Sequence, residues 1–201
     1  MTRVIVRADE PMAGTFEVEE VLRVVPPGNL VKGMFFSRHA ERLGDDFSAV
    51  QPRLADPPTR GRYLAFRDYP QHDYIRVYCA LAKKVFPRLG LNEGARRIAR
   101  EDFDVFAHSV LGRVVVALVR DARAALHKLP SVYDNVAPGD WGVSSRELPS
   151  GEVRIQFERL FGPWAYTAGQ IEGVVLAFGS TPRVCVEASG DGRVCFDVTL
   201  L

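Results

Sequence analysis

The feature that most constrains the fold is a change in sequence pattern after Gly139. From Trp141 to Leu148, and again from Glu152 to Phe161, apolar and polar residues alternate. Pro149, Ser150 and Gly151 separate the two runs and are typical turn residues. Alternation with a period of two on both sides of such a turn predicts a β-hairpin.

A helix and a second hairpin are expected after this first hairpin. Between Thr167 and Phe178 the apolar residues recur at helical spacing, and Gly179 follows as a stop signal. The runs Arg183–Ala188 and Arg193–Leu200 then alternate around a glycine-containing turn. The chain from about 140 to 201 is therefore predicted to form a hairpin, helix, hairpin module of ββαββ type.

The second hairpin has two distinct faces. Valines and Phe196 are expected to point inward, whereas Cys185 and Cys195 share the outward, charged face and become candidate cross-strand neighbours. Such a pair could be redox-active, but two thiols alone do not make a zinc site, which needs four ligands. Packed or partly exposed thiols are the favoured interpretation.

The residues before the module indicate mainly helices, over about 30–137. The stretches Arg3–Val6 and Phe16–Val25 are rich in valine and predict short extended pieces. Leu30–Leu43 has apolar residues at helical spacing, and Gly44 can end that helix.

Three further helices are expected in this part of the chain. Asp73 is a candidate cap for a helix that buries Cys79 and ends before Pro87. Asn92 can cap a longer helix, whose apolar stretch Phe106–Leu118 is predicted to be the central core helix. Asp121 can begin the last one. The sequence thus predicts a single α+β domain over 1–201, with a helical N-terminal two-thirds packed on a C-terminal antiparallel sheet.

Composition excludes several classes of function. The 26 Lys and Arg nearly balance the 25 Asp and Glu, so no overall field favours nucleic acid. Three scattered cysteines indicate reduced thiols, and neither a signal peptide nor a long apolar span is apparent, so a cytoplasmic location is expected. No glycine-rich phosphate loop or catalytic motif is present, which predicts a protein that is not an enzyme.

The sequence resembles a known family in several segments. These are VKGMFFSRHAERLG at 31–44, RYLAFRDYP at 62–70, NEGARRIAREDF at 92–103, HSVLGR at 108–113, and GQIEGVVLAFGSTPRVCVE at 169–187. They are similar to a myxobacterial paralogous family described only as a domain of unknown function. That resemblance spans most of the chain and implies no activity.

A second resemblance concerns the fold. The stretch from Gly169 onward, a Gly-xxx-Gly helix followed by a hairpin with two cysteines, is similar to the end of the 4-vinyl reductase domain, a small-molecule-binding module. The haem nitric-oxide-binding domain and Bet3-type trafficking subunits share helices packed on such a sheet. This resemblance implies a cleft between helices and sheet, with Phe157 and Trp164 as candidate ligand-binding residues.

The haem-binding relatives give a sharper expectation. They have a proximal histidine on the helix before the sheet and a Tyr-x-Ser-x-Arg propionate clamp on a later strand. By that resemblance His127 is the candidate axial ligand and Arg159 the remaining clamp residue. Ile155 and Phe157 stand where the clamp has hydroxyls.

Three hypotheses follow. The first is a non-enzymatic sensory or adaptor domain that holds a small apolar ligand or a partner protein in the helix–sheet cleft, without a cofactor. The second is a haem-based gas sensor that uses His127. The third is a structural dimerisation module, active as a homodimer.

Overall fold

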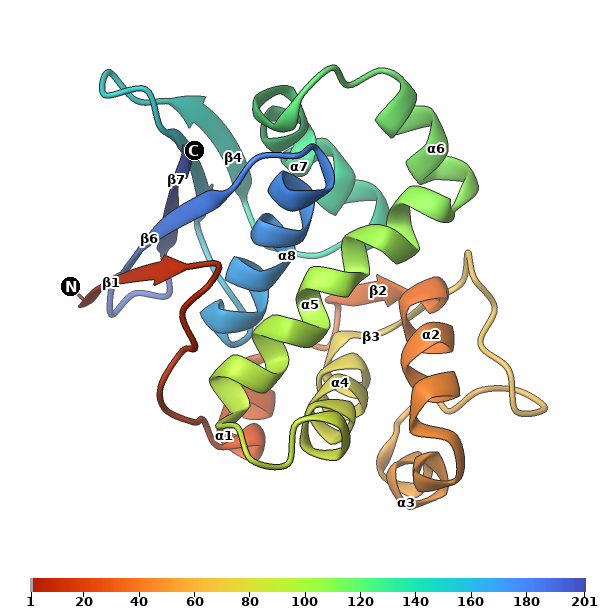
Figure 1. The fold of residues 1–201 in the computed structure, drawn as a ribbon. Coiled ribbons are helices and arrows are strands. Elements are labelled where there is room, and N and C mark those ends of the chain that lie inside the picture. Colours follow the sequence, from red (N-terminus) through yellow and green to blue (C-terminus); the bar gives the residue numbers. More distant parts are fainter. Residues whose placement is uncertain (1) are drawn as a thin grey trace.

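The computed structural model describes residues 2–201 and shows an α+β fold, which confirms the predicted fold class. A five-stranded antiparallel sheet lies on one side of the molecule and helices cover one of its faces (Figure 1). The strand order is β1-β6-β7-β5-β4. These strands are β1 (Thr2–Arg7), β4 (Val143–Glu147), β5 (Val153–Phe157), β6 (Pro182–Ala188) and β7 (Val194–Leu200).

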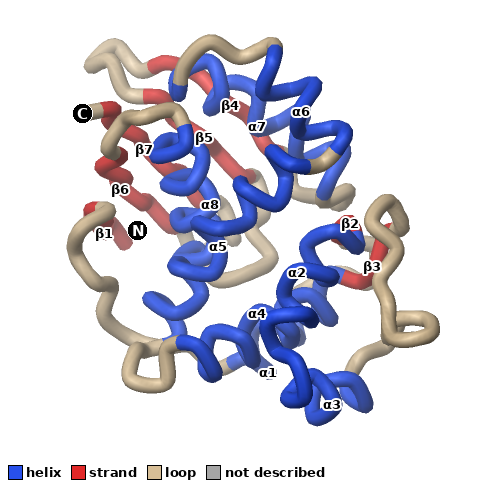
Figure 2. The backbone as a smooth tube through the Cα atoms, turned by 45° about the vertical axis from the view of Figure 1, so that its right-hand side comes forward, coloured by secondary structure: helices blue, strands red, loops and turns tan. Residues whose placement is uncertain are grey.

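The helices fall into two groups. Figure 2 shows α8 and α7 beside the sheet, α5 crossing α8, α6 next to α7, and α1 to α4 beyond α5. The longer helices are α2 (Gly33–Leu43), α4 (Gln71–Val85), α5 (Leu91–His108), α6 (Val110–Ala117), α7 (Ala122–Val136) and α8 (Trp164–Ala177). The shorter elements are α1 (Val18–Val24), α3 (Phe47–Val50), two 3-10 turns at Gly44–Asp46 and Gln51–Arg53, and the two-stranded pair β2 (Leu30–Lys32) and β3 (Asp68–Pro70).

The predicted module from about 140 to 201 is confirmed. Both hairpins and the helix between them form, and Gly179 adopts a positive φ of 76° just after α8. The inward residues of β6 and β7 are buried as predicted, with Val184, Phe196 and Val198 fully covered. The sequence did not show that β1, from the opposite end of the chain, joins this sheet by pairing with β6.

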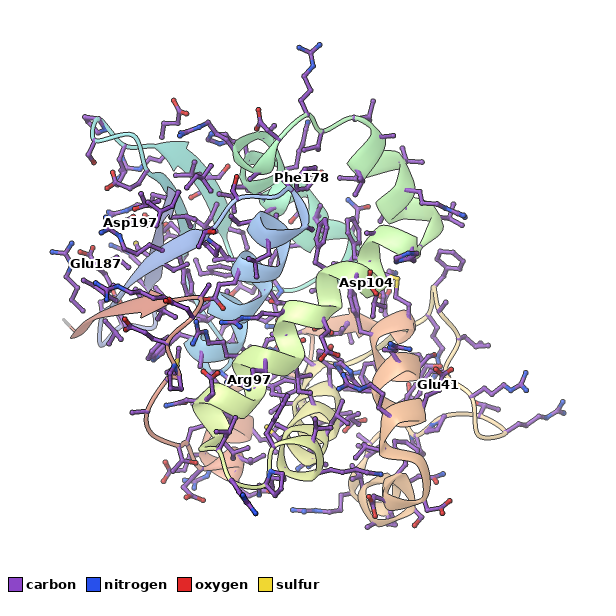
Figure 3. All side chains as sticks on the ribbon, in the orientation of Figure 1. Glu41, Arg97, Asp104, Phe178, Glu187 and Asp197 are labelled. Atoms are coloured by element: carbon purple, nitrogen blue, oxygen red, sulfur yellow. The ribbon has the colours of Figure 1, made fainter. Side chains whose placement is uncertain are left out.

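The outer face of the sheet is polar. Asp197 and Glu187 lie on this side of the sheet (Figure 3). Arg154 donates to both carboxylate oxygens of Asp197, at 2.6 and 2.7 Å, and also to Glu187. Cys185 lies opposite Asp197, and Cys195 lies opposite Glu187, so the two cysteines are diagonal rather than directly paired. Both are free thiols.

Helix α8 approaches α5 closely because of two glycines. A Cβ added to Gly169 would lie 2.1 Å from the carbonyl oxygen of Arg96, and one added to Gly173 would lie 2.4 Å from that of Arg100. Only a residue without a side chain allows two helix backbones to touch in this way. The Gly-xxx-Gly pattern therefore sets the crossing on which the helical layer is built.

A buried ion-pair network joins these two helices to the N-terminal segment. Arg96 and Glu172 are both fully buried and form a two-point contact of 2.6 and 2.9 Å, and Arg100 donates to Glu172 at 2.7 Å. The same arginines donate to backbone carbonyls of residues 7, 8 and 10. The N-terminal segment that follows β1 is thus fixed to the helices by buried charges, each of which has a partner.

Several expectations from the sequence are wrong. Val18–Val24 forms helix α1 rather than an extended piece, and Leu30–Lys32 is strand β2 rather than the first turn of a helix. Asp73 does not cap α4, because its carboxylate accepts from the backbone N–H groups of Ala55 and Asp56. The carboxylate instead holds the loop before β3 against α4.

The predicted central helix Phe106–Leu118 is also wrong. The helix breaks at Ser109, whose hydroxyl caps α6 by accepting from the N–H of Gly112. Val110 and Val114 of α6 and Leu118, just after its end, are 59%, 56% and 77% exposed. The central helices are α5 and α8, because the glycines of α8 allow a contact that a hydrophobicity pattern does not reveal.

Candidate functional site

A cavity of about 100 Å³ lies between four helices at the point where the helical layer meets the sheet module. Each helix contributes residues at spacings of three, four and seven, which place them on one helical face. The lining residues are Gln71, Tyr74, Ile75 and Tyr78 of α4; Asp102, Phe103 and Phe106 of α5; Leu129, Val132, Tyr133 and Val136 of α7; and Tyr166, Thr167, Gln170 and Val174 of α8. Val31, Phe35, Ala137, Trp141 and residues 160–163 complete the wall.

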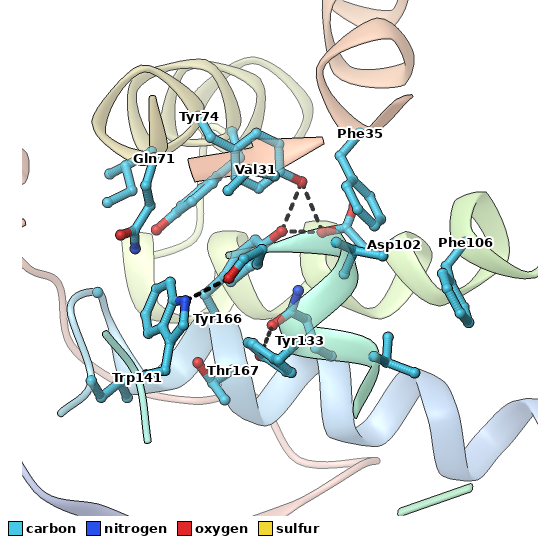
Figure 4. Close-up of a pocket in the computed structure, with 18 of the residues that line it drawn as sticks. Val31, Phe35, Gln71, Tyr74, Asp102, Phe106, Tyr133, Trp141, Tyr166 and Thr167 are labelled. Carbon is cyan, nitrogen blue, oxygen red and sulfur yellow. Dashed lines mark hydrogen bonds between the residues drawn. The ribbon is translucent and has the colours of Figure 1, made fainter. Parts of the chain in front are cut away.

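The wall is rich in aromatic residues and has one buried carboxylate, that of Asp102. Nine of its residues are Phe, Tyr or Trp. At one side the hydroxyls of Tyr74 and Tyr166 both donate to Oδ2 of Asp102, and the two hydroxyl oxygens lie 2.8 Å apart (Figure 4). Nε2 of His39, from α2 behind this wall, lies 2.8 Å from the Tyr74 hydroxyl and 3.3 Å from Oδ1 of Asp102.

The tyrosines of this wall remain protonated phenols. Burial, together with the nearby carboxylate of Asp102, raises the pKa of Tyr74 and of Tyr166 well above the ordinary value of 10.0. Burial likewise raises the pKa of Tyr78. These hydroxyls therefore act as hydrogen-bond donors over the whole physiological pH range.

Besides Oδ1 of Asp102, which is buried without a hydrogen-bond partner, two polar atoms of the cavity wall have no protein partner among residues 2–201. Gln71 donates through its amide nitrogen to the carbonyl of Phe161, but its Oε1 is buried without a donor. The hydroxyl of Tyr78, a residue only 2% exposed, makes none of the hydrogen bonds found in the described chain. Buried polar groups normally have a partner, so these two are available to a bound molecule.

The four residues singled out from the sequence lie outside this cavity. His127 is exposed on α7, and its Nδ1 lies 3.3 Å from the hydroxyl of Ser145. Arg159 is exposed and pairs with Asp140 at 2.8 Å. Phe157 is fully buried behind the wall, with its ring centroid 5.2 Å from that of Tyr133, and half-buried Trp164 packs into the sheet-side core.

The residues that do form the site were overlooked because each looks like an ordinary core residue. The signal was present in the spacing of Gln71, Tyr74 and Tyr78, which places three polar-tipped residues on one face of α4. Asp102 gave a second signal, because a carboxylate on the apolar side of a helix needs a buried partner.

A match to a family model covers residues 25–199. The chain belongs to the family of proteins of unknown function DUF2378. No curated protein matches the chain. The predicted relationship to a family without a known activity is therefore confirmed.

Solved structures of H-NOX proteins, the haem nitric-oxide-binding group, share the fold. That of S. oneidensis in the Fe(II)NO state is 11% identical, with a TM-score of 0.65 and coverage of 85% of this chain and 99% of that chain. The Fe(II) unliganded protein of K. algicida is 14% identical, with a TM-score of 0.60 and coverage of 85% and 96%. A variant of the T. tengcongensis protein is 14% identical, with a TM-score of 0.61 and coverage of 84% and 97%.

The residues of this chain do not fit a haem. Helix α7, which precedes the sheet, presents Leu129, Val132, Tyr133 and Val136 to the cavity, while His127 lies outside it. None of the described lining residues is a histidine, lysine or arginine, so the wall offers neither an axial imidazole nor a cation for propionates. The volume of about 100 Å³ is also small beside the roughly 300–1,000 Å³ of sites for drug-sized ligands.

Two further structural findings bear on the sequence-based hypotheses. Among residues 2–201, no cluster of three or more His, Cys, Asp or Glu is arranged to hold a metal ion. Over the same residues no helix is both long enough and apolar enough to cross a membrane.

Proposed function

We propose that this protein is a sensory or adaptor domain that binds a small, largely apolar ligand in the cavity between α4, α5, α7 and α8, without haem and without catalysing a reaction. The observation that carries the proposal is the cavity itself, a largely apolar space rich in aromatic residues whose wall retains a buried amide oxygen of Gln71 and a buried carboxylate oxygen of Asp102 without hydrogen-bond partners. Concave, mostly apolar spaces with a few placed polar groups are typical of ligand sites.

The volume limits the size of the ligand. A dry apolar cavity of roughly 150 Å³ is enough to bind benzene. The cavity of about 100 Å³ therefore suits a molecule of a few carbon atoms, or a slightly larger one if side chains of the wall move apart. The α+β fold shared with H-NOX domains supports a sensor role by analogy. The cavity carries the proposal, because a fold by itself does not determine function.

The intrinsic fluorescence of Trp141 provides a direct test. Trp141 lines the cavity and Trp164 does not, so a Trp164→Phe variant reports on the cavity alone. Addition of 3-methylbutanol is expected to change the emission of that variant in a saturable way. A second substitution, Val136→Phe, fills the space from α7 and should abolish the change. A linear response that Val136→Phe leaves intact would contradict the proposal.

The haem-sensor alternative is tested by the absorbance of the purified protein mixed with haemin. We expect no Soret band beyond that of free haemin. The control is His127→Ala, which should behave like the wild type. A stoichiometric Soret band that His127→Ala removes would overturn the haem-free proposal.

The dimerisation alternative is favoured by one observation, the exposed stripe of Val110, Val114 and Leu118 along α6. Residues four apart on a helix lie on the same face, so the three form one apolar strip. On this second proposal the strip contacts a second copy of the chain. Light scattering after size-exclusion chromatography should then show a homodimer that Val114→Asp converts to a monomer, whereas an unchanged mass would exclude this contact. We expect the protein to act in the cytoplasm, whether as a monomer or as a homodimer.

A further inference from the structure

The charge of the cavity wall identifies the class of ligand. Asp102 is the only residue with a formal charge among the described residues that line it. Its side chain is 3% exposed, and both tyrosine hydroxyls that reach it are neutral donors. A buried carboxylate costs much free energy unless it has a cationic partner or enough hydrogen bonds.

His39 is the basic side chain that lies within 4 Å of Asp102 among the described residues. Its Nε2 faces Tyr74 and Asp102, whereas its Nδ1 is buried without a hydrogen-bond partner among the described residues. A proton on Nε2 alone satisfies the observed contacts. Oδ1 of Asp102, 3.3 Å from Nε2, is likewise buried without a hydrogen-bond partner among the described residues, so this carboxylate oxygen is open to a donor from a bound molecule.

Other cations near this region are engaged elsewhere. Arg42 of α2 pairs with Glu101, and Arg100 of α5 pairs with Glu172. Neither lines the cavity. Among the described residues, no arginine or lysine therefore lines the space beside Asp102, and His39 is the basic side chain that reaches this carboxylate.

The aromatic rings around the space favour a cation. The faces of Tyr and Phe rings carry negative charge density and attract cations. Tyr74 and Phe35 stand beside Asp102 in the wall, as Figure 4 shows. The two unpartnered atoms on α4 fit as well, because Oε1 of Gln71 is an acceptor and the hydroxyl of Tyr78 can accept.

We propose that the ligand is a small organic amine, bound as an ammonium ion whose N–H groups face Asp102 and whose hydrocarbon part lies against the aromatic wall. This inference rests on the proposed function, since it assigns a chemical class to the ligand of the same cavity. The same wall disfavours carboxylates, whose charge would meet that of Asp102 at close range in a medium of low polarity.

Three probes with one carbon skeleton test the class. These are 3-methylbutylammonium, 3-methylbutanol and 3-methylbutanoate, titrated into the full chain at pH 7 by calorimetry. We expect the ammonium ion to bind about ten to a hundred times more tightly than the alcohol, the range for a charged against a neutral hydrogen bond. The carboxylate should not bind measurably.

Two variants locate the charge that matters. Asp102→Asn keeps the size of the side chain and removes its charge, so it should reduce the affinity for the ammonium ion to that for the alcohol. The matched control is Asp104→Asn, two residues further along α5, where the carboxylate is 72% exposed and contacts His108 only on the surface. That variant should bind all three probes as the wild type does.

The outcomes separate the two proposals. Equal affinity for the ammonium ion and the alcohol, or tighter binding of the carboxylate, would overturn the amine assignment and leave a ligand-binding cavity in place. Failure of all three probes to bind would count against the cavity as a ligand site and against this inference together. Because the wild type alone gives the order of the three probes, the test remains decisive if Asp102→Asn does not fold.

Discussion

Substitution of Gly169 by alanine tests the packing on which the whole site depends. The new Cβ would lie 2.1 Å from the carbonyl oxygen of Arg96 and 2.9 Å from its carbonyl carbon. Both atoms belong to the backbone of α5, so no side-chain rotation relieves the overlap. Helix α8 must therefore move away from α5, which also disturbs the contact between Arg96 and Glu172.

The expected size of the effect combines two opposing contributions. Overpacking in a close-packed core typically costs about 1–3 kcal/mol, and the rigidity of two backbones favours the upper end. Alanine in place of glycine in a helix returns about 1 kcal/mol. We expect a net loss of about 2 kcal/mol in the free energy of unfolding, or about 4–8 °C in Tm for a chain of this size.

Urea denaturation, followed by circular dichroism, measures this loss as a lower midpoint at an unchanged slope. Gly190→Ala is the matched control, because a Cβ at Gly190 meets no heavy atom within 4 Å and should leave stability unchanged to within about 0.5 kcal/mol. If Gly169→Ala were as stable as the wild type, the close crossing of α5 and α8 would be refuted. The placement of Asp102 opposite Tyr166 would then fail with it.

Three further predictions concern buried groups. Glu172→Gln leaves the fully buried Arg96 without its main counter-charge and should lower the free energy of unfolding, measured in urea, by about 3–5 kcal/mol. The control Glu158→Gln, at an exposed residue just after β5, should have little effect on that free energy. Burial opposes the ionisation of Glu93, but hydrogen bonds from Arg97 and the N–H of Met12 outweigh it and place the pKa of Glu93 below 4.5. The stabilisation from ionised Glu93 is therefore complete above pH 4.5 and is lost as the pH falls through the lowered pKa. Glu93→Gln should make the free energy of unfolding fall less steeply at acid pH. An unchanged acid dependence would contradict this. Burial raises the pKa of Cys79, so in the native protein a thiol reagent at pH 8 should modify Cys185 first and Cys79 only after unfolding.

Sequence patterns predicted the sheet module well because its signals are local. Pro149, Ser150 and Gly151 mark a turn, and the alternation after them identifies the buried face of β5. The pairing of β1 with β6 could not be read in the same way. It joins the two ends of the chain, and nothing near Val4 or Val186 specifies which strand lies beside which.

The error at Phe106–Leu118 has a physical cause. Continuous apolar content predicts burial, but the break at Ser109 turns α6 so that Val114 and Leu118 face outward. The sequence contained the relevant signs, a serine that caps and a glycine three residues later. The capping signal at Ser109 favours a break, whereas the apolar repeat of Phe106–Leu118 favours one continuous helix. Tertiary packing decides between the two, and a single sequence does not show that packing.

The site was predicted less well than the fold. His127 and Arg159 attract notice because they are polar and resemble positions used by haem-binding relatives, yet both are exposed. The cavity residues come from four helices that are far apart in the sequence, and only the tertiary structure brings Tyr74, Asp102 and Tyr166 within hydrogen-bond distance. Their roles follow from their burial and from which of their polar atoms have hydrogen-bond partners, and not from a sequence motif.

The central claim, that a small ligand binds in the cavity between α4, α5, α7 and α8, is tested most directly by methyl NMR. A protein labelled at Ile, Leu and Val methyl groups would be titrated with 3-methylbutylammonium. We expect saturable chemical-shift changes at the methyl groups of Ile75, Val132 and Val136, which line the cavity. We expect none at Val184 or Val198, which are buried on the inner face of the sheet. Shifts confined to the sheet side or to α6, or no saturable shift at all, would contradict the central claim.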